Sequence, residues 1–226
     1  MPRRRRCVAL DLDGTLVDSL PALRRAYEAF LLELGKQGSD AEFARLNGPN
    51  MTTIVFLLKE GHDLRTPHEE LLRRYSRYVQ QAYRNVEPVR DADELLRFIA
   101  AEGYSRALVT SSPRSEVQGI LERLNWRHWF DVTVCGDEVS AAKPDPAVYH
   151  RACKLGGWRP DECVAVEDAP AGVRAAVAAG LEVIGVGSVE QLAGLRDSGA
   201  AWVCGTLAQV REMLEGLSVR AVSGYV

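Results

Sequence analysis

Paired carboxylates beside two apolar runs are the residues in this sequence best suited to chemistry. Asp11 and Asp13 follow the first apolar run of the chain, and Glu167-Asp168 closes a later one. Alternation along a strand places Asp11 and Asp13 on one face. Four carboxylates gathered at one place repel one another unless a cation lies among them, and oxygen donors with little His or Cys select a hard ion. The sequence therefore predicts a Mg²⁺ site.

Groups that could bind an anion stand at two further positions. Thr110-Ser111-Ser112 offers hydroxyls and backbone amides at the start of an expected helix, where anions bind readily. Lys143 precedes a helix that begins with proline, and its compact ammonium could neutralise a phosphate. Phosphoryl transfer needs such a set, because a carboxylate attacks in line while a cation and donors stabilise the equatorial oxygens. We therefore predict phosphoryl-transfer chemistry.

Six short apolar runs, separated by helical patterns, are the elements that must position these residues. They cover residues 7–12, 106–110, 132–135, 163–167, 182–186 and 202–204. Strands that alternate with helices predict a parallel α/β sheet. Ligands of such sheets bind outside the carboxyl ends of the strands. We therefore expect the carboxylates, the hydroxyls and the lysine to meet at one edge of the sheet.

The alternation of strand and helix is interrupted once, between residue 18 and about residue 90. Helical patterns over residues 21–34, 41–46, 52–59 and 67–84 follow one another there, separated by turns with Gly, Asn or Pro. We therefore predict an α/β fold with a three-layer, Rossmann-like core and a parallel sheet. The core domain is expected from residues 1–17 and 91–226, and an inserted all-helical cap domain from residues 18–90.

The composition excludes several other classes of protein. Of the 226 residues, 46% are hydrophobic and 26% are charged, as in ordinary globular proteins. There are 28 Lys and Arg against 31 Asp and Glu, a net charge of −3, and four of the arginines form the run 3–6. Since the remainder is more acidic still, we expect no nucleic-acid partner, because nucleic-acid binders need a cationic surface.

The apolar segments and the cysteines of the sequence predict the location of the protein and the redox state of its thiols. No apolar stretch is long enough for a membrane span and no export signal follows the basic start, so we expect no membrane partner and a cytoplasmic location. The five cysteines are scattered and odd in number, which favours buried reduced thiols over disulfides or zinc. The sequence leaves open whether the protein is a monomer or a dimer.

Four motifs, taken together, resemble the haloacid dehalogenase-like superfamily of phosphohydrolases over nearly the whole chain. They are Asp11-Leu-Asp-Gly-Thr-Leu-Val-Asp-Ser19, Thr110-Ser-Ser112, Lys143-Pro144 and Val-Glu-Asp-Ala-Pro-Ala-Gly172, in the order and strand contexts of that superfamily. The helical insertion after the first strand looks like its C1 cap. The resemblance implies a phosphoric monoester hydrolase.

The resemblance also implies a role for each residue that matches a motif. Asp11 would be the nucleophile that forms an aspartyl phosphate. Asp13 would give a proton to the leaving alcohol and then take one from water. Thr110 and the Ser111 amide would hold the transferring phosphoryl group, while Lys143 would bridge that group and the Asp11 carboxylate. Each role supplies charge stabilisation or positioning, which a slow monoester hydrolysis requires.

The metal ligands implied by the resemblance come from the same two carboxylate pairs. Asp11, the backbone carbonyl of Asp13 and Asp168 would bind Mg²⁺. Glu167 would bind the ion directly or through a water molecule. The resemblance thus agrees with the ion that the donor set itself predicts.

Within the superfamily the sequence resembles phosphoglycolate phosphatases, sugar phosphatases and β-phosphoglucomutases. We predict a phosphatase of small phosphorylated metabolites, of the phosphoglycolate or sugar-phosphate type. A β-phosphoglucomutase is the alternative, because its Glu-Asp fourth motif resembles Glu167-Asp168. In the mutase a His and a cap Arg help to bind a sugar bisphosphate, whereas Leu23 and Met51 stand at those places here. Both differences favour the phosphatase.

Other activities fit the sequence less well. A haloacid dehalogenase needs no acid at the position of Asp13, and a phosphonatase needs an imine-forming cap lysine, whereas Lys36 and Lys59 look like solvated residues. A protein of another class would bind a phosphorylated ligand or a nucleic acid without turnover. The presence of both Asp11 and Asp13 argues against a protein that binds without turnover.

Substrate choice is expected from a polar turn of the cap. The turn runs from Asn47 to Thr53 and contains Gly48-Pro49, a pair that resembles phosphoglycolate phosphatases. Its polar groups could face the phosphate pocket when the cap closes. We therefore predict that Asn47, Asn50 and Thr52 contact the substrate.

Overall fold

A parallel sheet forms the centre of the protein, which is represented here by a computed structural model that describes residues 6–222. In this part of the chain the sheet has six strands, β1 (Cys7–Leu10), β2 (Ser105–Val109), β3 (Val132–Val134), β4 (Cys163–Glu167), β5 (Glu182–Val186) and β6 (Trp202–Cys204). Their order is β3-β2-β1-β4-β5-β6, and every neighbouring pair is parallel. The first strand therefore lies in the middle, with Cys7 opposite both Ser105 and Cys163.

All six predicted strands are present, with shifts of one or two residues at some ends. The largest shift is at β1, which ends at Leu10 instead of residue 12. Beyond Leu10 the backbone amide of Asp11 still bonds to Val166, but the chain then turns back, and the Gly14 amide donates to the Val17 carbonyl. Gly14 has a φ of +81°, which only glycine adopts at little cost. The turn lifts Asp11 and Asp13 out of the sheet edge.

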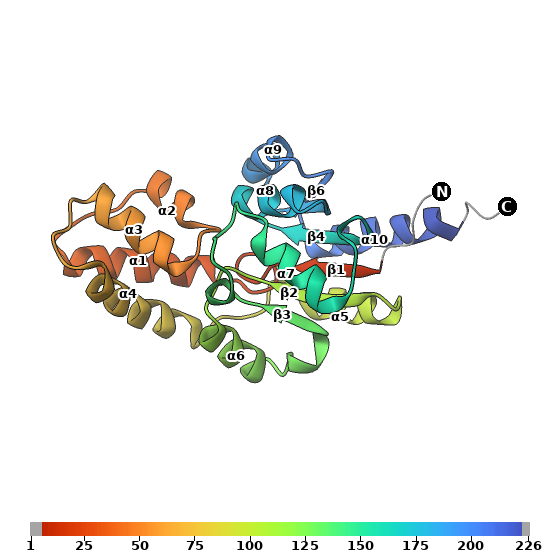
Figure 1. Cartoon of the computed structure of the whole chain (residues 1–226), viewed down its shortest axis with the longest axis horizontal. Coiled ribbons are helices and arrows are strands. Elements are labelled where there is room, and N and C mark those ends of the chain that lie inside the picture. Colours follow the sequence, from red (N-terminus) through yellow and green to blue (C-terminus); the bar gives the residue numbers. More distant parts are fainter. Residues whose placement is uncertain (1–5, 223–226) are drawn as a thin grey trace.

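Helices cover both faces of the sheet, as the predicted three layers require (Figure 1). Helices α5 (Ala92–Ala101) and α10 (Leu207–Val222) pack on one face, and α7 (Ala147–Gly156), α8 (Pro170–Ala178) and α9 (Val189–Asp197) on the other. Successive residues of β1 point to opposite faces. Val8 and Leu10 accordingly belong to one hydrophobic core, and Cys7 and Ala9 to the other.

The remaining connections are short. Helix α6 (Arg114–Arg123) follows β2. Of three 3₁₀ turns in the described residues, η1 (Arg127–Trp129) precedes the edge strand β3, η2 (Gly136–Glu138) follows it, and η3 (Pro160–Glu162) precedes the interior strand β4. Because all neighbouring strands are parallel, their carboxyl ends lie at one edge of the sheet, where the following helices begin. That edge faces the cap.

Four helices between β1 and α5 form the cap, which lies beside the sheet in Figure 1. They are α1 (Leu20–Glu33), α2 (Asp40–Leu46), α3 (Met51–Gly61) and α4 (His68–Tyr83), close to the predicted spans. Their buried faces join in a core that includes Phe30, Leu58 and Leu71 and is continuous with one side of the sheet. The α/β core with a helical cap is therefore confirmed, while the exact domain limits at residues 17 and 90 stay a prediction.

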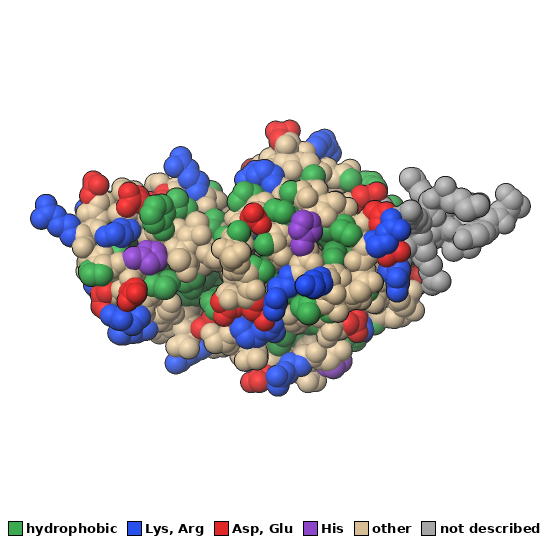
Figure 2. Space-filling model, in the orientation of Figure 1, with side chains coloured by type: hydrophobic (Ala, Val, Ile, Leu, Met, Phe, Trp, Pro, Cys, Tyr) green, Lys and Arg blue, Asp and Glu red, His purple; other side chains and the backbone are tan. Residues whose placement is uncertain are grey.

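The charged side chains on the surface and the state of the cysteines match what the amino-acid composition predicts. Lys and Arg side chains alternate with Asp and Glu over the face shown in Figure 2. Of the basic run 3–6, Arg6 alone lies within the described residues, and its guanidinium is 3.7 Å from Glu162. All five cysteines are buried and free, as predicted. In residues 6–222, no helix has the length and apolar character that crossing a bilayer requires.

Candidate active site

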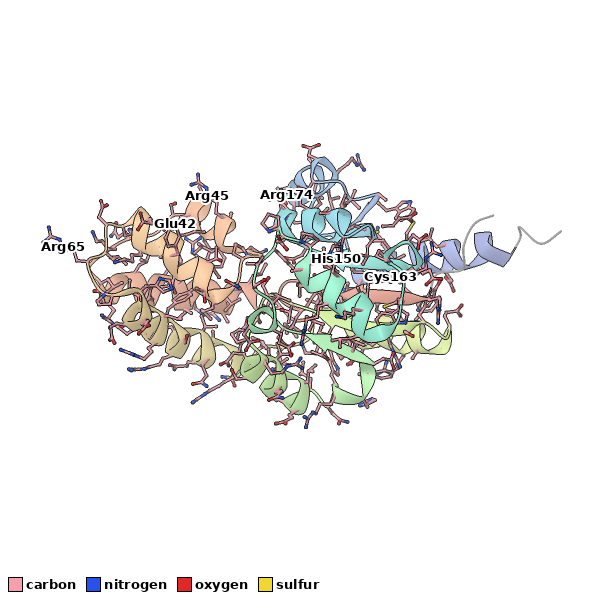
Figure 3. The ribbon with its side chains drawn as sticks, in the orientation of Figure 1. Glu42, Arg45, Arg65, His150, Cys163 and Arg174 are labelled. Carbon is pink, nitrogen blue, oxygen red and sulfur yellow. The ribbon has the colours of Figure 1, made fainter. Side chains whose placement is uncertain are left out.

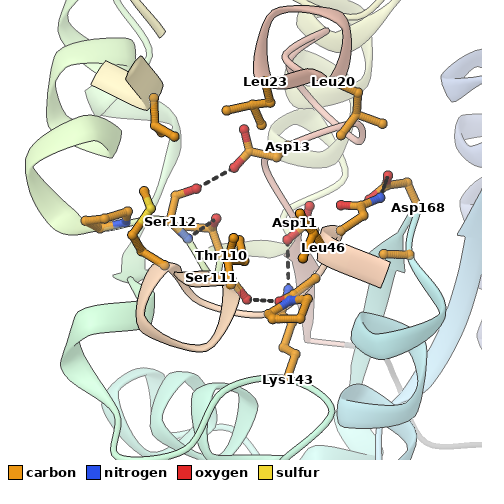
Figure 4. Close-up of a pocket in the computed structure, with 18 of the residues that line it drawn as sticks. Asp11, Asp13, Leu20, Leu23, Leu46, Thr110, Ser111, Ser112, Lys143 and Asp168 are labelled. Atoms are coloured by element: carbon orange, nitrogen blue, oxygen red, sulfur yellow. Dashed lines mark hydrogen bonds and ion pairs between the residues drawn. The ribbon is translucent and has the colours of Figure 1, made fainter. Parts of the chain in front are cut away.

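The motif residues meet in one cavity between the carboxyl edge of the sheet and the cap (Figure 4). Asp11 and Asp13 follow β1, Thr110 and Ser111 follow β2, and Glu167 and Asp168 stand at the end of β4. Lys143 comes from the loop before α7, and Asn47 from the turn between α2 and α3. The parallel sheet thus brings together side chains that lie up to about 157 positions apart in the sequence.

Lys143 is the electrostatic centre of the cavity. Its ammonium donates to Asp11 Oδ1 at 2.8 Å, to Glu167 Oε1 at 2.6 Å and to the Val109 carbonyl at 3.1 Å. The side chain is buried, which by itself would lower the pKa of Lys143, but the attraction of Asp11 and Glu167 outweighs burial and raises this pKa. Lys143 therefore carries its charge at every physiological pH and holds the two carboxylates in place.

Three carboxylates form a group that fits a hard cation. Asp11, Glu167 and Asp168 are buried and each offers one oxygen, all within 4.8 Å of one another. Burial, followed by the charge of Glu167, raises the pKa of Asp168 to about 7. Burial raises the pKa of Asp11 too, against the attraction of Lys143. A divalent ion such as Mg²⁺ favours the ionised form of buried carboxylates, because its positive charge offsets their burial and their mutual repulsion.

Asp168 is oriented by neighbours from two directions. Thr15 Oγ1 donates to Asp168 Oδ1 at 3.4 Å, and Asn47 Nδ2 in the cap donates to Oδ2 at 3.1 Å. A side chain at Gly14 would collide with the same carboxylate. The glycine after the first motif therefore does two things: it allows the turn after β1, and it leaves room for Asp168.

Asp13 lies apart from this acidic group. Its two carboxylate oxygens each accept a hydrogen bond at 2.6 Å, one from Ser19 Oγ and the other from Ser112 Oγ. Figure 4 shows the Asp13 side chain turned toward Ser112 and away from Lys143. The carboxylates of Asp11 and Asp13 therefore have separate surroundings, although they are two residues apart.

The loop after β2 presents donors to the cavity. Thr110 is buried, and its Oγ1 accepts a bond from the Ser112 amide at 3.1 Å, so the hydroxyl hydrogen stays available. Among the described residues, the Ser111 amide has no hydrogen-bond acceptor. The Ser111 hydroxyl donates to the Gly48 carbonyl and thereby ties this loop to the cap. One hydroxyl and one amide thus remain for an anion.

The predicted cap contacts divide into two sets. Asn47 lines the cavity and bonds to Asp168. Asn50 and Thr52 are not among the residues that line it. Asn50 is the N-cap of α3, where its side chain accepts the Thr53 amide, and Thr52 is exposed to solvent. The structure therefore brings Asn47, but not Asn50 or Thr52, to the site.

Helices contribute residues that sequence reasoning missed. Tyr149 on α7 donates its hydroxyl to Glu167 Oε1, and Tyr83 at the end of α4 lies 2.8 Å from Ser112 Oγ. A side chain at Gly172, in the first turn of α8, would collide with the Glu167 carboxylate. The motif Glu167 to Gly172 includes this glycine, but nothing in an amphipathic helix marks one tyrosine as a neighbour of the site.

Comparison with known proteins agrees with this geometry. Residues 8–186 match the family model described as haloacid dehalogenase-like hydrolase. A phosphorylated carbohydrates phosphatase of Thermotoga maritima is 31% identical over 78% of this chain and 82% of its own length. A phosphoglycolate phosphatase of Pseudomonas putida is 32% identical over 80% of this chain and 69% of its own length. This chain spans 48% of another relative, the bifunctional riboflavin kinase/FMN phosphatase of Arabidopsis thaliana, which is 29% identical over 81% of this chain.

Solved structures share the fold. A haloacid dehalogenase family hydrolase from Deinococcus radiodurans with bound phosphate and sodium is 26% identical, covers 95% of this chain and 97% of its own, and has a TM-score of 0.74. A β-phosphoglucomutase from Clostridium difficile is 18% identical, with coverages of 97% and 99% and a TM-score of 0.84. At that identity the second likeness concerns the fold alone.

Proposed function

The chain belongs to the haloacid dehalogenase-like hydrolases, and from this premise we propose that it is a Mg²⁺-dependent phosphatase that forms an aspartyl phosphate on Asp11. Its substrates are small phosphorylated metabolites of the sugar-phosphate or phosphoglycolate type, the classes on which the named relatives act. Free buried thiols are compatible with the proposed cytoplasmic location.

The observation that carries the proposal is the contact of Lys143 with Asp11. A buried ammonium 2.8 Å from a carboxylate oxygen fixes the direction of that carboxylate and neutralises charge beside it. A carboxylate so held can approach a phosphoryl group without the full repulsion between two anions. Thr110 and the Ser111 amide lie on the same cavity and supply the donors that a phosphoryl group needs.

In the first step an Asp11 oxygen attacks phosphorus, the bond from phosphorus to the ester oxygen breaks, and the phosphoryl group is transferred to Asp11. The leaving oxygen takes a proton from Asp13. In the second step Asp13 takes a proton from water, the resulting hydroxide oxygen bonds to phosphorus, and the bond between phosphorus and Asp11 breaks. Asp11 is regenerated as a carboxylate and inorganic phosphate leaves.

Mg²⁺ would be held by Asp11, Asp168 and the backbone carbonyl of Asp13, with Glu167 binding directly or through water. When bound, the ion neutralises charge on the phosphoryl oxygens. Glu167 Oε1 already accepts from Lys143 and Tyr149. These two bonds support a role for Glu167 in orienting Lys143, and its other oxygen would bind the ion or its water.

The test measures the release of inorganic phosphate from a panel of esters in the presence of Mg²⁺. The parent protein and the Asp11→Asn variant are assayed side by side. The panel contains phosphoglycolate, glycerol phosphate, hexose and pentose phosphates and nucleoside monophosphates. We expect release by the parent protein and none above background by the variant. Equal release by both proteins would remove Asp11 as the nucleophile.

The mutase alternative is tested in the same experiment. Leu23 and Met51, which stand where the mutase has its His and its cap Arg, both line the cavity. These places thus present apolar side chains to the substrate, and this supports the phosphatase. Formation of glucose 6-phosphate from β-glucose 1-phosphate and a bisphosphate primer, without net phosphate release, would establish the mutase.

A further inference from the structure

The cavity has two chemically different ends. The end formed by the sheet carries all the charged groups, whereas the wall formed by the cap is apolar (Figure 4). The empty space between them, including the opening to solvent, is about 700 Å³. The cap wall consists mainly of aliphatic and aromatic side chains: Leu20, Leu23, Phe43, Met51, Ile54 and Val79. The part of a substrate beyond its phosphoryl group must lie against this wall.

Positive charge is missing from the cap wall. Among the described residues that line the cavity, Lys143 alone is cationic, and it is occupied by Asp11 and Glu167. The guanidinium carbon of Arg24 lies 5.3 Å from the centroid of the Phe43 ring. This guanidinium is already bound to two acidic side chains, those of Glu28 and Asp40.

Other arginines of the cap point elsewhere. Figure 3 shows Arg45 directed outward from α2 and Arg65 at the end of the cap far from the sheet. Neither lines the cavity. A second anionic group on the substrate would therefore be desolvated against mainly apolar side chains with no cation beside it, which is costly.

Most polar groups of the wall are already used. Asn47 donates one amide hydrogen to Asp168, the Gly48 carbonyl accepts from the Ser111 hydroxyl, and Tyr83 is bonded to Ser112. A leaving group with many hydroxyls would find few partners there, and each unmade hydrogen bond costs free energy.

Two polar groups of the wall keep unused hydrogen-bonding atoms within the described part of the chain: the Asn47 amide, which has bonded only one of its hydrogens, and the Tyr75 hydroxyl. Tyr75 lines the cavity and is 3% exposed, and its hydroxyl makes no hydrogen bond within the described part of the chain. Burial raises the pKa of Tyr75, so the hydroxyl stays protonated and can donate. With the second Asn47 N–H, the wall can thus satisfy about two hydrogen-bond acceptors on the leaving group.

We infer that the preferred leaving group is an uncharged alcohol with a mainly apolar carbon skeleton, and that the cap disfavours a second anionic group. The inference rests on the proposed phosphatase chemistry at Asp11 but departs from the substrate classes of the named relatives, because it ranks neutral apolar esters above phosphoglycolate and above hydroxyl-rich sugar phosphates. The cap distinguishes two substrates of the same shape because one of them buries a charge with no cation beside it and the other does not.

Isobutyl phosphate and phosphoglycolate form a matched pair for the test. They share the –CH₂–O–PO₃ end, and an isopropyl group in one replaces a carboxylate of similar size and shape in the other. We expect kcat/KM for isobutyl phosphate to exceed that for phosphoglycolate by about tenfold or more, with glucose 6-phosphate also below isobutyl phosphate. The aryl ester p-nitrophenyl phosphate serves as a general substrate, and Asp11→Asn as the inactive control.

A cation placed in the cap wall should reverse the preference. Met51→Lys keeps an unbranched side chain at the start of α3, and we expect it to shift the ratio of the two kcat/KM values toward phosphoglycolate by about tenfold. Ile54→Lys, one turn further on the same helix, is the second variant should the first be poorly folded. Phe56→Lys is the matched control, since Phe56 is 54% exposed on α3 and does not line the cavity.

The outcomes separate the two proposals. Phosphoglycolate hydrolysed as well as isobutyl phosphate, in a reaction lost in Asp11→Asn, would overturn the inference and leave the phosphatase standing. An unchanged ratio in both lysine variants of the wall would overturn it as well. Release from none of the four esters would overturn the proposed function and this inference with it.

Discussion

The Tyr83 hydroxyl, at the last residue of cap helix α4, lies 2.8 Å from the Ser112 hydroxyl in the loop after β2. Ser112 has one hydroxyl hydrogen and donates it to Asp13, so Tyr83 must be the donor to Ser112. A chain of two hydrogen bonds, the first of them buried, therefore links the cap to the carboxylate proposed as acid and base. The position of Asp13 depends on the position of the cap.

Tyr83→Phe tests this link. The variant keeps the ring and removes one buried hydrogen bond, worth about 1 kcal/mol, so we expect kcat to fall about fivefold. KM should change little, because Tyr83 orients Asp13 through Ser112 and does not hold the phosphoryl group. Steady-state kinetics on one ester measure both quantities. Tyr78→Phe, on the same helix, is the control. An equal loss in both variants would mean that the effect comes from the cap helix in general.

Asp11→Asn should remove turnover without unfolding the protein. The substitution takes one charge from a buried acidic group, so we expect a melting temperature equal to that of the parent or higher, while phosphate release is lost. Thermal unfolding and phosphate release are measured on the same preparation. Asp197→Asn, at the exposed end of α9, should leave both properties unchanged. A variant that unfolds at room temperature would contradict the expectation.

Mg²⁺ should stabilise the protein more at higher pH. The pKa of Asp168 is raised to about 7, so without metal the folded protein keeps this proton up to about pH 7, whereas the unfolded chain loses it near pH 4. Raising the pH across that window destabilises the metal-free fold. Bound Mg²⁺ replaces the proton, so the rise in melting temperature caused by Mg²⁺ should grow from pH 5 and level off above about pH 7.

The control for this experiment is Asp168→Asn, in which the increase with pH should disappear. EDTA should abolish phosphate release by the parent protein, and excess Mg²⁺ should restore it. A rise in melting temperature of equal size at pH 5 and at pH 8 would show that Asp168 does not couple the ion to the proton.

Gly172→Ala should displace a site residue from the side of helix α8. The added methyl group would collide with the Glu167 carboxylate, which bonds to Lys143 and Tyr149. We expect a loss of about 1–3 kcal/mol in the free energy of unfolding, typical of overpacking, together with a lower kcat. Gly119→Ala in α6 is the matched control. Nothing lies near that Cβ, so the change should stabilise the helix by up to about 1 kcal/mol. A stable and fully active Gly172→Ala protein would show that Glu167 has room to move.

The sheet and the convergence of its strand ends could be predicted from the sequence because both depend on local patterns. Each buried strand is a short apolar run, and Asp11, Thr110 and Asp168 lie immediately beyond the ends of their strands. A parallel sheet then leaves these residues only one edge on which to meet. Their relative placement needed no knowledge of side-chain packing.

The cap side of the site could not be predicted in the same way. Tyr75 and Tyr83 belong to the buried stripe of α4, whose pattern specifies an inward face but not what that face meets. Asn50 and Thr52 stand in a polar turn that looks suited to a ligand. The start of α3 uses the side chain of Asn50, and the 3.6-residue period turns Thr52 outward.

The central position of β1 has a consequence for the protein during its synthesis. Cys7 pairs with Ser105 and Cys163, so the first strand leaves the ribosome roughly a hundred residues before one neighbour and more than 150 before the other. The cap helices, which make local contacts with one another, can form during that interval. Asp11 meets Lys143 and Asp168 only after most of the chain has emerged. A nascent chain therefore carries the carboxylate proposed as the nucleophile long before Lys143 and Asp168 reach it, and the site can assemble only after β4 has been made.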